Sequence, residues 1–311
     1  MGTLTVKLSF TSPVHFGQGR LSDSGYSCDA ATLFSALYIE ALHGGDQDEL
    51  LAAAKSGELG ISDAFPYVGD TMYLPKPQIE PTARTGNQSQ QPVNSDPRER
   101  KAYKKLSYIS IARYHDFLSG NFDAYAELAQ FDLGKSDLRT RVNTLRIETD
   151  DALPYHVGSY SFRPNAGLYF LVRGTYDISG LLEQLSYAGL GGKRSSGYGR
   201  FTFSVVQTRE PMLTSAASTD ATSNILLATA TPREDELNDV LLDGARYRLI
   251  RKGGFVQSAT HSATPTKKRD MYLFATGSSF PRTFEGDVFD VNTTPGSHPV
   301  YRYARAFWMA V

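Results

Sequence analysis

The stretch GLGGKRSSGYGRF, residues 189–201, combines three kinds of residue that bind anions. Five of its thirteen residues are glycine, Lys193 and Arg194 are adjacent cations, and two serines follow them directly. Glycine loses more freedom on folding than any other residue, so this density indicates a backbone shape that side chains would obstruct. Successive N–H groups in such turns form anion-binding concavities, and arginine binds phosphate through two hydrogen bonds. The chemistry that these residues suggest is the binding of a phosphate or a chain of phosphates.

Two well-known nucleotide-binding motifs do not fit this stretch. A P-loop needs a glycine, four residues and then Gly-Lys-Ser/Thr, but Tyr187 stands at the first position and Arg194 at the last. The dinucleotide fingerprint needs a third glycine where Arg194 stands. Both motifs also run from a strand into a helix, whereas a helical pattern precedes this stretch and a strand pattern follows it. Two interpretations stay open on these residues alone: a loop that binds the backbone of a polyanion, and a surface turn with incidental charge.

A second group of candidate residues is HFGQGR at residues 15–20. His15 and Phe16 can stack on unpaired bases, and Arg20 can bind phosphate. The alternative is a turn in which His15 hydrogen-bonds a carbonyl group.

Two basic clusters follow later in the chain. A hairpin is predicted over about 139–162, and its basic face either contacts a polyanion or is simply solvated. In the second half, Arg246 and Arg248 share one strand face, and Arg251 and Lys252 precede two glycines. This second cluster is either another contact to a polyanion or a surface for another protein.

Catalytic and metal-binding sites find little support. Metal-independent cleavage of RNA needs an acid/base pair aligned on the 2′-OH and the leaving oxygen, and His15 is the single histidine of the first loop. The other histidines, at 43, 115, 156, 261 and 298, are scattered. Cys28 is the only cysteine, so neither a zinc site of paired cysteines nor an internal disulfide is expected. We expect no metal and no cofactor.

Composition indicates a folded intracellular protein. The 311 residues are 41% hydrophobic and 12% aromatic, enough to bury a core. A net charge of −1 argues against a uniformly basic protein that coats nucleic acid, but it is compatible with a local basic groove. One cysteine suits a reducing compartment, and no run approaches a membrane span or the apolar core of a signal peptide. We expect a cytoplasmic protein with no membrane partner.

Hydrophobic spacing places the candidate residues on regular elements. Alternation over residues 4–10 predicts a strand, Asp29 is expected to cap a helix, and Gly57 is expected to end a second helix. The remaining expectations in the first half are a hairpin turning at 68–70, a polar loop over 82–100 that leads into a basic helix, a helix over 177–189 and a strand from about 198.

Residues 209–223 have the composition of a linker, which predicts domains at 1–208 and 209–311. Beyond the linker we expect a strand at 225–229, a helix over 234–244 and four further strands. Each half can be interpreted as the pattern strand-helix-strand-strand-helix-strand, or as part of that pattern with insertions. The predicted fold class is α+β, with two ferredoxin-like (RRM-like) domains carrying an inserted hairpin and loops.

The glycine-rich stretch resembles the signature loop of the RAMP superfamily, the RNA-binding proteins of CRISPR effector complexes. Further segments narrow the resemblance to one family, the fourth subunit of the type III-A (Csm) interference complex; they are SFTSPVHFGQGRLSDS, TLFSALYIEAL, ISDAFPYVGDTMYLPKP, YHVGSYSFRPNAGLYFLV, RKGGFV and HPVYRYARAFW. These segments span most of the chain. One departure is CDAATLFSAL, where the family pattern is closer to Ser-Asp-Thr-Leu-Phe.

The resemblance implies a non-catalytic subunit that captures the 5′ repeat-derived tag of the guide (CRISPR) RNA. Its implied protein partners are the large polymerase/nuclease subunit and the backbone RAMP subunit, and it meets target RNA only indirectly. The glycine-rich loop becomes the cradle for the RNA backbone, and the hairpin over 139–162 becomes the thumb that RAMP proteins press against the guide. The RNA-binding residues implied are His15, Phe16, Gly17, Gly19, Arg20, Arg139, Arg141, Asn143, Arg146, Gly189, Gly191, Gly192, Lys193, Arg194, Ser195, Ser196, Gly197, Tyr198, Gly199, Arg251 and Lys252.

Two other hypotheses stand beside this one. The chain could be a metal-independent RAMP endoribonuclease that processes guide RNA with His15 as general acid/base. A generic RRM-like RNA binder outside CRISPR is the third hypothesis, and KRSSGYGRFTF lacks the stacked-aromatic spacing of an RRM motif.

Overall fold

The first half is built on one antiparallel sheet. The computed structural model describes residues 2–79, 97–142, 154–218, 221–256, 264, 266–293 and 298–311. Adjacent strands follow the order β11-β1-β10-β5-β6-β7, and β4 also pairs with β10. The strands are β1 (Leu4–Phe10), β4 (Leu59–Ile61), β5 (Phe65–Val68), β6 (Thr71–Pro75), β7 (Tyr108–Ser110), β10 (Ala166–Gly174) and β11 (Phe201–Gln207). Because β1 pairs with β11, the first and last strands of this half lie side by side in the sheet.

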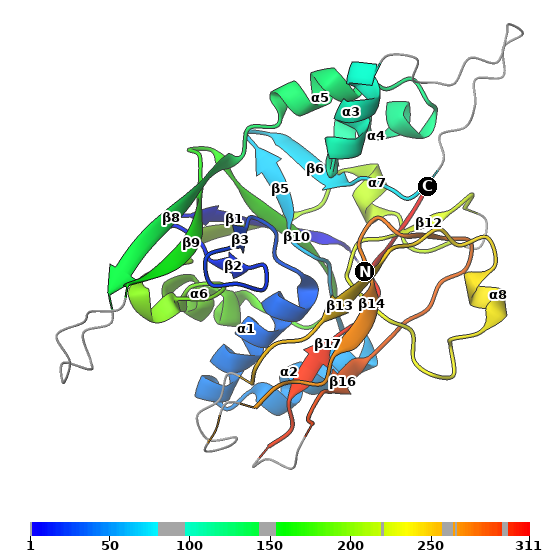
Figure 1. Ribbon diagram of the computed structural model, residues 1–311. Coiled ribbons are helices and arrows are strands. Elements are labelled where there is room, and N and C mark those ends of the chain that lie inside the picture. The colour runs from blue at the N-terminus through cyan, green and yellow to red at the C-terminus, as the bar shows by residue number, and fades with distance from the viewer. Residues whose placement is uncertain are drawn as a thin grey trace, which may run out of the picture.

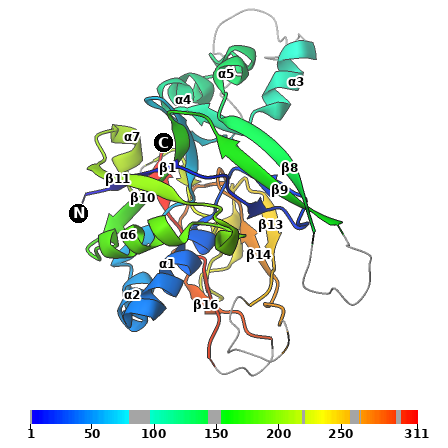
Figure 2. The same ribbon diagram turned by 90° about the vertical axis from the view of Figure 1, so that its left-hand side faces the viewer.

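Helices α1 (Ala30–Gly44) and α6 (Ser179–Ala188) lie next to each other against this sheet, followed on the outside by α2 (Gln47–Ser56) (Figure 1, Figure 2). The predicted cap of α1 is confirmed, because the Asp29 carboxylate accepts the Thr32 N–H at 2.8 Å. Gly57 ends α2 in the left-handed conformation, as predicted. The hairpin predicted at 68–70 is formed by β5 and β6.

Two insertions decorate the sheet (Figure 1). Helices α3 (Pro97–Lys105), α4 (Ile111–Leu118) and α5 (Ala124–Gln130) gather at one end of the molecule. The long strands β8 (Gly134–Val142) and β9 (Pro154–Phe162) form the predicted basic hairpin, which projects from the body. A small ribbon of β2 (Phe16–Gly17) and β3 (Ser24–Gly25) packs against it, where Val14 and Tyr160 pair through their backbones.

The second half consists of short antiparallel strands. Strand β12 (Asn224–Leu226) lies between β15 (Ser279–Phe280) and β18 (Trp308–Ala310). Two separate ribbons are formed by β13 (Leu249–Lys252) with β14 (Met271–Phe274), and by β16 (Val288–Asp290) with β17 (Tyr301–Tyr303). The described helices are α7 (Pro211–Thr214) and α8 (Asp239–Leu242). The chain is thus a mixed α/β protein with antiparallel sheets.

The helix predicted over 234–244 is wrong in extent, since only Asp239–Leu242 is helical. The cause is the Glu236 carboxylate, which accepts the N–H groups of Arg233 at 2.8 Å and Glu285 at 2.8 Å. These bonds hold the preceding segment as a turn. The Asn238 side chain then caps the short helix by accepting the Leu241 N–H at 2.9 Å.

The two halves share one hydrophobic core. Ile225, Leu227 and Met309 of the second half belong to the same buried cluster as the central strands of the first-half sheet. The predicted linker is also packed, because Leu213 is fully buried. Arg173 of β10 donates to the carbonyl oxygens of Trp308 at 2.7 Å and Ser215 at 2.8 Å. The halves are therefore joined by a continuous interior and not by a free tether.

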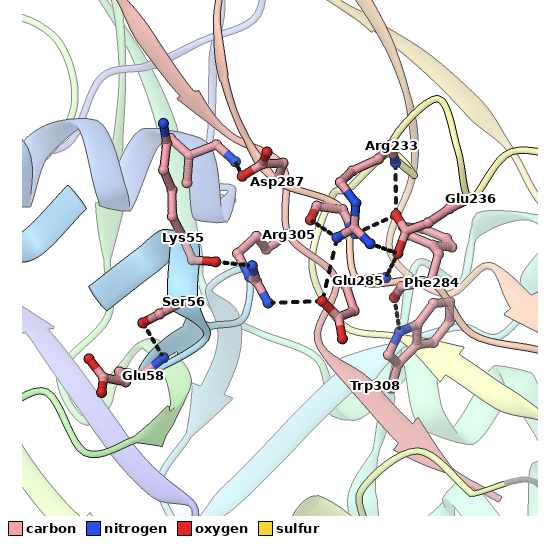
Figure 3. Close-up of polar contacts among 12 residues, drawn as sticks. Lys55, Ser56, Glu58, Arg233, Glu236, Phe284, Glu285, Asp287, Arg305 and Trp308 are labelled. Carbon is pink, nitrogen blue, oxygen red and sulfur yellow. Dashed lines mark hydrogen bonds and ion pairs between the residues drawn. The ribbon is translucent and has the colours of Figure 1, made fainter. Parts of the chain in front are cut away.

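Polar contacts reinforce this junction at the end of α2 (Figure 3). The Arg305 guanidinium donates to the Lys55 carbonyl oxygen at 2.7 Å and lies 3.8 Å from the Glu285 carboxylate. Arg233 approaches the same Glu285 carboxylate at 3.4 Å, and the Trp308 indole donates to a neighbouring backbone carbonyl at 2.8 Å. Among the described residues no helix is long and apolar enough to cross a membrane.

Candidate RNA-binding site

A cavity of about 700 Å³ lies where three of the predicted clusters meet. The first loop contributes His15–Gln18, the glycine-rich loop contributes Gly191, Gly192 and Arg194, and β13 with the following glycine contributes Ile250–Gly253. The N-terminus of α1 lines the same cavity through Asp29. Clusters separated by more than 200 positions in the sequence are therefore brought to one place by the shared core of the two halves.

The glycine-rich loop is folded tightly by its own backbone. Gly199 has φ +78°, and an added Cβ would lie 2.1 Å from the Leu190 carbonyl oxygen. The Gly192 N–H donates to the His15 carbonyl at 2.9 Å, and the Gly199 N–H donates to Pro13 at 2.8 Å. The expectation that this loop has free backbone N–H groups is therefore corrected at Gly192 and Gly199. Gly189, Tyr198 and Gly199 are buried and shape the loop, which leaves the segment from Gly191 to Gly197 accessible.

The exposed part of this loop carries its cations. Lys193 adopts the left-handed conformation at φ 61° and is followed by a 3₁₀ turn, Arg194–Ser196, which is closed by the Ser196 N–H donating to the carbonyl oxygen of Lys193 at 2.9 Å. Its ammonium lies 5.6 Å from the ring centre of Tyr155 on the hairpin. Arg194 approaches the nearly buried Glu40 carboxylate at 3.3 Å, so part of its charge is already compensated. Ser195 and Ser196 are exposed beside it.

The first loop is only partly available to a ligand. His15 is 8% exposed, and its Nδ1–H donates to the Gly158 carbonyl at 2.7 Å, which is the structural alternative foreseen for it. Phe16 is 5% exposed and packs edge-on against Phe10. The expectation that the Phe16 ring stacks on a base is therefore corrected, because the ring belongs to the core. Gly17, Gly19 and Arg20 are exposed.

The hairpin of β8 and β9 also contacts the glycine-rich loop. The Arg141 guanidinium lies 5.5 Å from the ring centre of the buried Tyr198, which connects the two elements. Arg139 is half exposed and pairs with Asp137 on the same strand at 3.1 Å. The predicted residues Asn143 and Arg146 lie outside the described residues.

The second half adds a group of cations around the cavity. Lys252 forms an ion pair with the capping Asp29 at 2.7 Å, and Arg251 lies 3.9 Å from the Asp270 carboxylate. Arg248, Lys268 and Arg302 also line the cavity. Lys268 and Arg302 were not among the candidates from sequence, although the run TKKRD was a visible signal for the first. Burial lowers the pKa of Lys268, and the neighbouring Arg302 lowers it further.

An aspartate joins the two halves at the wall of the cavity. The Asp63 carboxylate accepts the N–H groups of Ala30 and Thr229, both at 2.8 Å, and the Thr229 hydroxyl at 2.7 Å. Burial and the nearby Asp29 raise the pKa of Asp63 to about 7, against these hydrogen bonds, which lower it. The cavity therefore changes charge near neutral pH. Among the described residues no group of His, Cys, Asp and Glu side chains is arranged to hold a metal ion.

Comparison with known proteins gives the family. Residues 219–311 match the CRISPR Csm4 C-terminal domain. The chain is 38% identical over 301 residues to the CRISPR system Cms protein Csm4 of Mycobacterium tuberculosis (strain CDC 1551 / Oshkosh), covering 96% of this chain and 94% of the relative. It is 32% identical over 292 residues to Csm4 of Streptococcus thermophilus, covering 94% and 93%.

Solved structures share the fold. In a Csm3-Csm4 subcomplex of a type III-A CRISPR-Cas interference complex, the similar chain has a TM-score of 0.65 at 17% identity, with 100% of this chain and 99% of that chain covered. In a Csm1-Csm4 cassette in complex with pppApA, the TM-score is 0.62 at 21% identity, with 100% and 98% covered. From its sequence relatives along nearly the whole length, the chain belongs to the Csm4 family of CRISPR Csm proteins.

Proposed function

We propose that this protein is a non-catalytic RNA-binding subunit of a type III-A CRISPR complex that seats the 5′ repeat-derived tag of the guide RNA. Its proposed protein partners are the large polymerase/nuclease subunit and the backbone RAMP subunit. Solved assemblies of similar chains with Csm1 and with Csm3 support these two partners. Target RNA is met indirectly, through the guide.

The observation that carries the proposal is the convergence at the cavity. Gly191, Gly192 and Arg194 of the glycine-rich loop line one space together with the first loop and β13. Exposed serines, cations and a tight backbone are the groups that bind phosphate and the 2′-OH of RNA. The hairpin stands beside this space through the contacts Lys193–Tyr155 and Arg141–Tyr198.

The proposal is tested by retention of tagged guide in the purified complex. We expect the double substitution K193A/R194A to weaken retention, most visibly at high salt, because the overall affinity is lowest there and the loss of contacts is no longer masked by saturated binding. The slope of log affinity against log salt should fall by about 0.7 for each single-strand phosphate that the protein no longer neutralises. The matched control is K104A/K105A, which removes two exposed cations from α3 that do not line the cavity. Equal guide occupancy in wild type and K193A/R194A would contradict the proposal that the glycine-rich loop binds the backbone of the guide RNA.

The endoribonuclease hypothesis is disfavoured by the surroundings of His15. Its Nδ1 is engaged with a carbonyl group, and no second histidine lines the cavity among the described residues. An acid/base pair would need such a partner. We expect H15A to leave guide maturation intact; loss of maturation with intact assembly would make the subunit an enzyme.

We also propose that both halves are ferredoxin-like. In the first half, β1 lies between β10 and β11, and in the second half β12 lies between β15 and β18 in the same way. An experimental structure in which residues 209–311 lack a helix-covered sheet centred on β12 would contradict this.

A further inference from the structure

The β13–β14 ribbon concentrates positive charge on an otherwise balanced chain. The whole protein has a net charge of −1. Residues 246–255 and 266–272, the ribbon with its flanks, carry a single acid, Asp270. Their basic residues are Arg246, Arg248, Arg251, Lys252, Lys267, Lys268 and Arg269. A local excess of this size attracts a polyanion whatever the overall charge.

The same ribbon exposes large side chains. Tyr272 is 64% exposed and stands opposite Arg251 in the strand register. Phe255 is 60% exposed and follows Gly253-Gly254 at the end of β13. Within the described part of the chain, no other ring or cation contacts the rings of these two residues. Tyr247 differs, because it packs on Phe274 with ring centres 4.8 Å apart.

The ribbon is continuous with the cavity. Arg251 lines the cavity and is also the cross-strand partner of Tyr272. Side chains directly opposite each other in an antiparallel pair have Cβ atoms about 5 Å apart. A strand of RNA that leaves the cavity past Arg251 therefore meets the ring of Tyr272 next.

Charge decides between the possible occupants of this face. The centre of a protein–protein interface is enriched in arginine and aromatic rings but depleted of lysine, and the ribbon with its flanks carries the lysines Lys252, Lys267 and Lys268. Surfaces for single-stranded nucleic acid combine backbone-binding cations of both kinds with aromatic rings. Bases stack on such rings, and every base has a face that can do so. The arrangement of exposed Tyr272 and Phe255 among basic side chains has the second composition.

We propose that the outer face of the β13–β14 ribbon is a base-stacking surface for single-stranded RNA, with Tyr272 as its principal platform and Phe255 as the second. It extends the proposed cradle by at least one nucleotide, and it rests on the proposed function because its ligand is the guide RNA leaving the cavity. Specificity for base type is not expected here, since stacking tolerates every base.

The test uses the full-length chain and a short single-stranded RNA of the tag sequence, with a fluorescent adenine analogue placed at one position at a time. We expect Y272A to weaken binding about tenfold and to abolish the quenching of the analogue at one position. Y272F should restore both, because the ring is kept. Y272L should behave like Y272A, because an aliphatic side chain does not stack. F255A should affect a neighbouring position more weakly.

Other outcomes overturn the inference in distinguishable ways. If K193A/R194A weakens binding while Y272A and Y272L bind and quench like wild type, the stacking surface is wrong and the cradle stands. If the Y272A protein binds RNA like wild type but no longer binds the purified large subunit, the face is a protein-docking surface. If the wild-type chain and the assembled complex both fail to bind the tag RNA, the proposed function falls together with the inference. Circular dichroism should show unchanged folding, since Tyr272 is mostly exposed.

Discussion

The glycine-rich loop and the β13–β14 ribbon face the same cavity but are built in opposite ways. The loop depends on shape: buried Gly189 and Gly199 allow backbone approaches that no side chain would permit, and its Arg194 is partly compensated by Glu40. The ribbon depends on charge: it is an ordinary antiparallel pair that carries a dense set of cations, and its Arg251 lies 3.9 Å from the carboxylate of Asp270.

This difference separates folding from binding. A side chain added inside the loop should disturb the fold and the ligand site together. Removal of Arg248 or Arg251, which are exposed on the ribbon, should change RNA binding and leave the fold alone, because exposed side chains contribute little to stability. The predictions below test that separation.

The largest effect is expected for Gly199→Ala. The new Cβ would lie 2.1 Å from the Leu190 carbonyl oxygen at a φ of +78°. We expect a loss of about 3 kcal/mol in the free energy of unfolding, measured with urea, and a loss of guide binding. The matched control is Gly197→Ala, at φ +81° with no atom within 4 Å of the new Cβ. It should cost about 1 kcal/mol; equal losses in the two variants would contradict the role given to shape.

The second effect concerns Arg248 and Arg251 on the ribbon. We expect each alanine substitution to weaken RNA binding about tenfold at low salt. The slope of log affinity against log salt should fall by about 0.7 for each phosphate that the variant no longer neutralises. The unfolding midpoint in urea should not move. A destabilised fold with an unchanged salt slope would show that these cations are structural.

The third effect separates the two roles of Arg194. Its removal leaves Glu40, whose side chain is 7% exposed, without this partner, so we expect R194A to lower the free energy of unfolding by about 1–2 kcal/mol. E40Q in addition should recover most of that stability, since the buried charge is gone. Guide binding should stay weak in the double variant. Recovery of binding together with stability would mean that Arg194 only supports the loop.

The smallest effect, over any one pH unit, is a pH dependence from Asp63, whose pKa is raised to about 7 by burial and by Asp29. The folded state holds this proton more tightly than the unfolded chain, so the stability from Asp63 falls as pH rises from about 4 to about 7 and is constant above that. The slope should be at most about 1.4 kcal/mol per pH unit. RNA binding should weaken around pH 7, where the folded protein loses this proton and the cavity gains a negative charge.

Asp63→Asn should remove both trends. Its amide oxygen can accept the two N–H groups that Asp63 accepts, and its NH₂ group can donate to the Thr229 hydroxyl. Urea unfolding and RNA binding across neutral pH measure the two trends. A D63N protein with the wild-type pH profile would place the titrating group elsewhere.

Local structure was largely predictable from the sequence. The Asp29 cap, the left-handed Gly57 and the hairpin at 68–70 depend on neighbouring residues, and each is present as expected. The half-buried cations of the glycine-rich loop, Lys193 and Arg194, were recognised for the same reason. Their chemistry is visible in the residues themselves.

What required the structure was everything set by distant packing. The sequence does not show whether a phenylalanine in a loop stacks on a base or packs into the core, and Phe16 packs into the core. The helix predicted over 234–244 is shorter because the N–H groups of Glu285 and Gly286, about 50 positions away, donate hydrogen bonds to the Glu236 carboxylate. Lys268 and Arg302 join the site only because the two halves close around one cavity. The run TKKRD marked Lys268 as part of a basic segment, but its neighbours in the sequence do not show that it reaches this cavity.

The central claim is that the cavity between the two halves receives the 5′ tag of the guide. The most direct measurement is photocrosslinking in the assembled complex, with a photoreactive base at successive tag positions and the crosslinked peptides identified by mass spectrometry. The account predicts crosslinks in residues 191–197 and 248–255, with adjacent tag positions reaching Tyr272. Crosslinks confined to other surfaces, with these segments left unmodified, would contradict it.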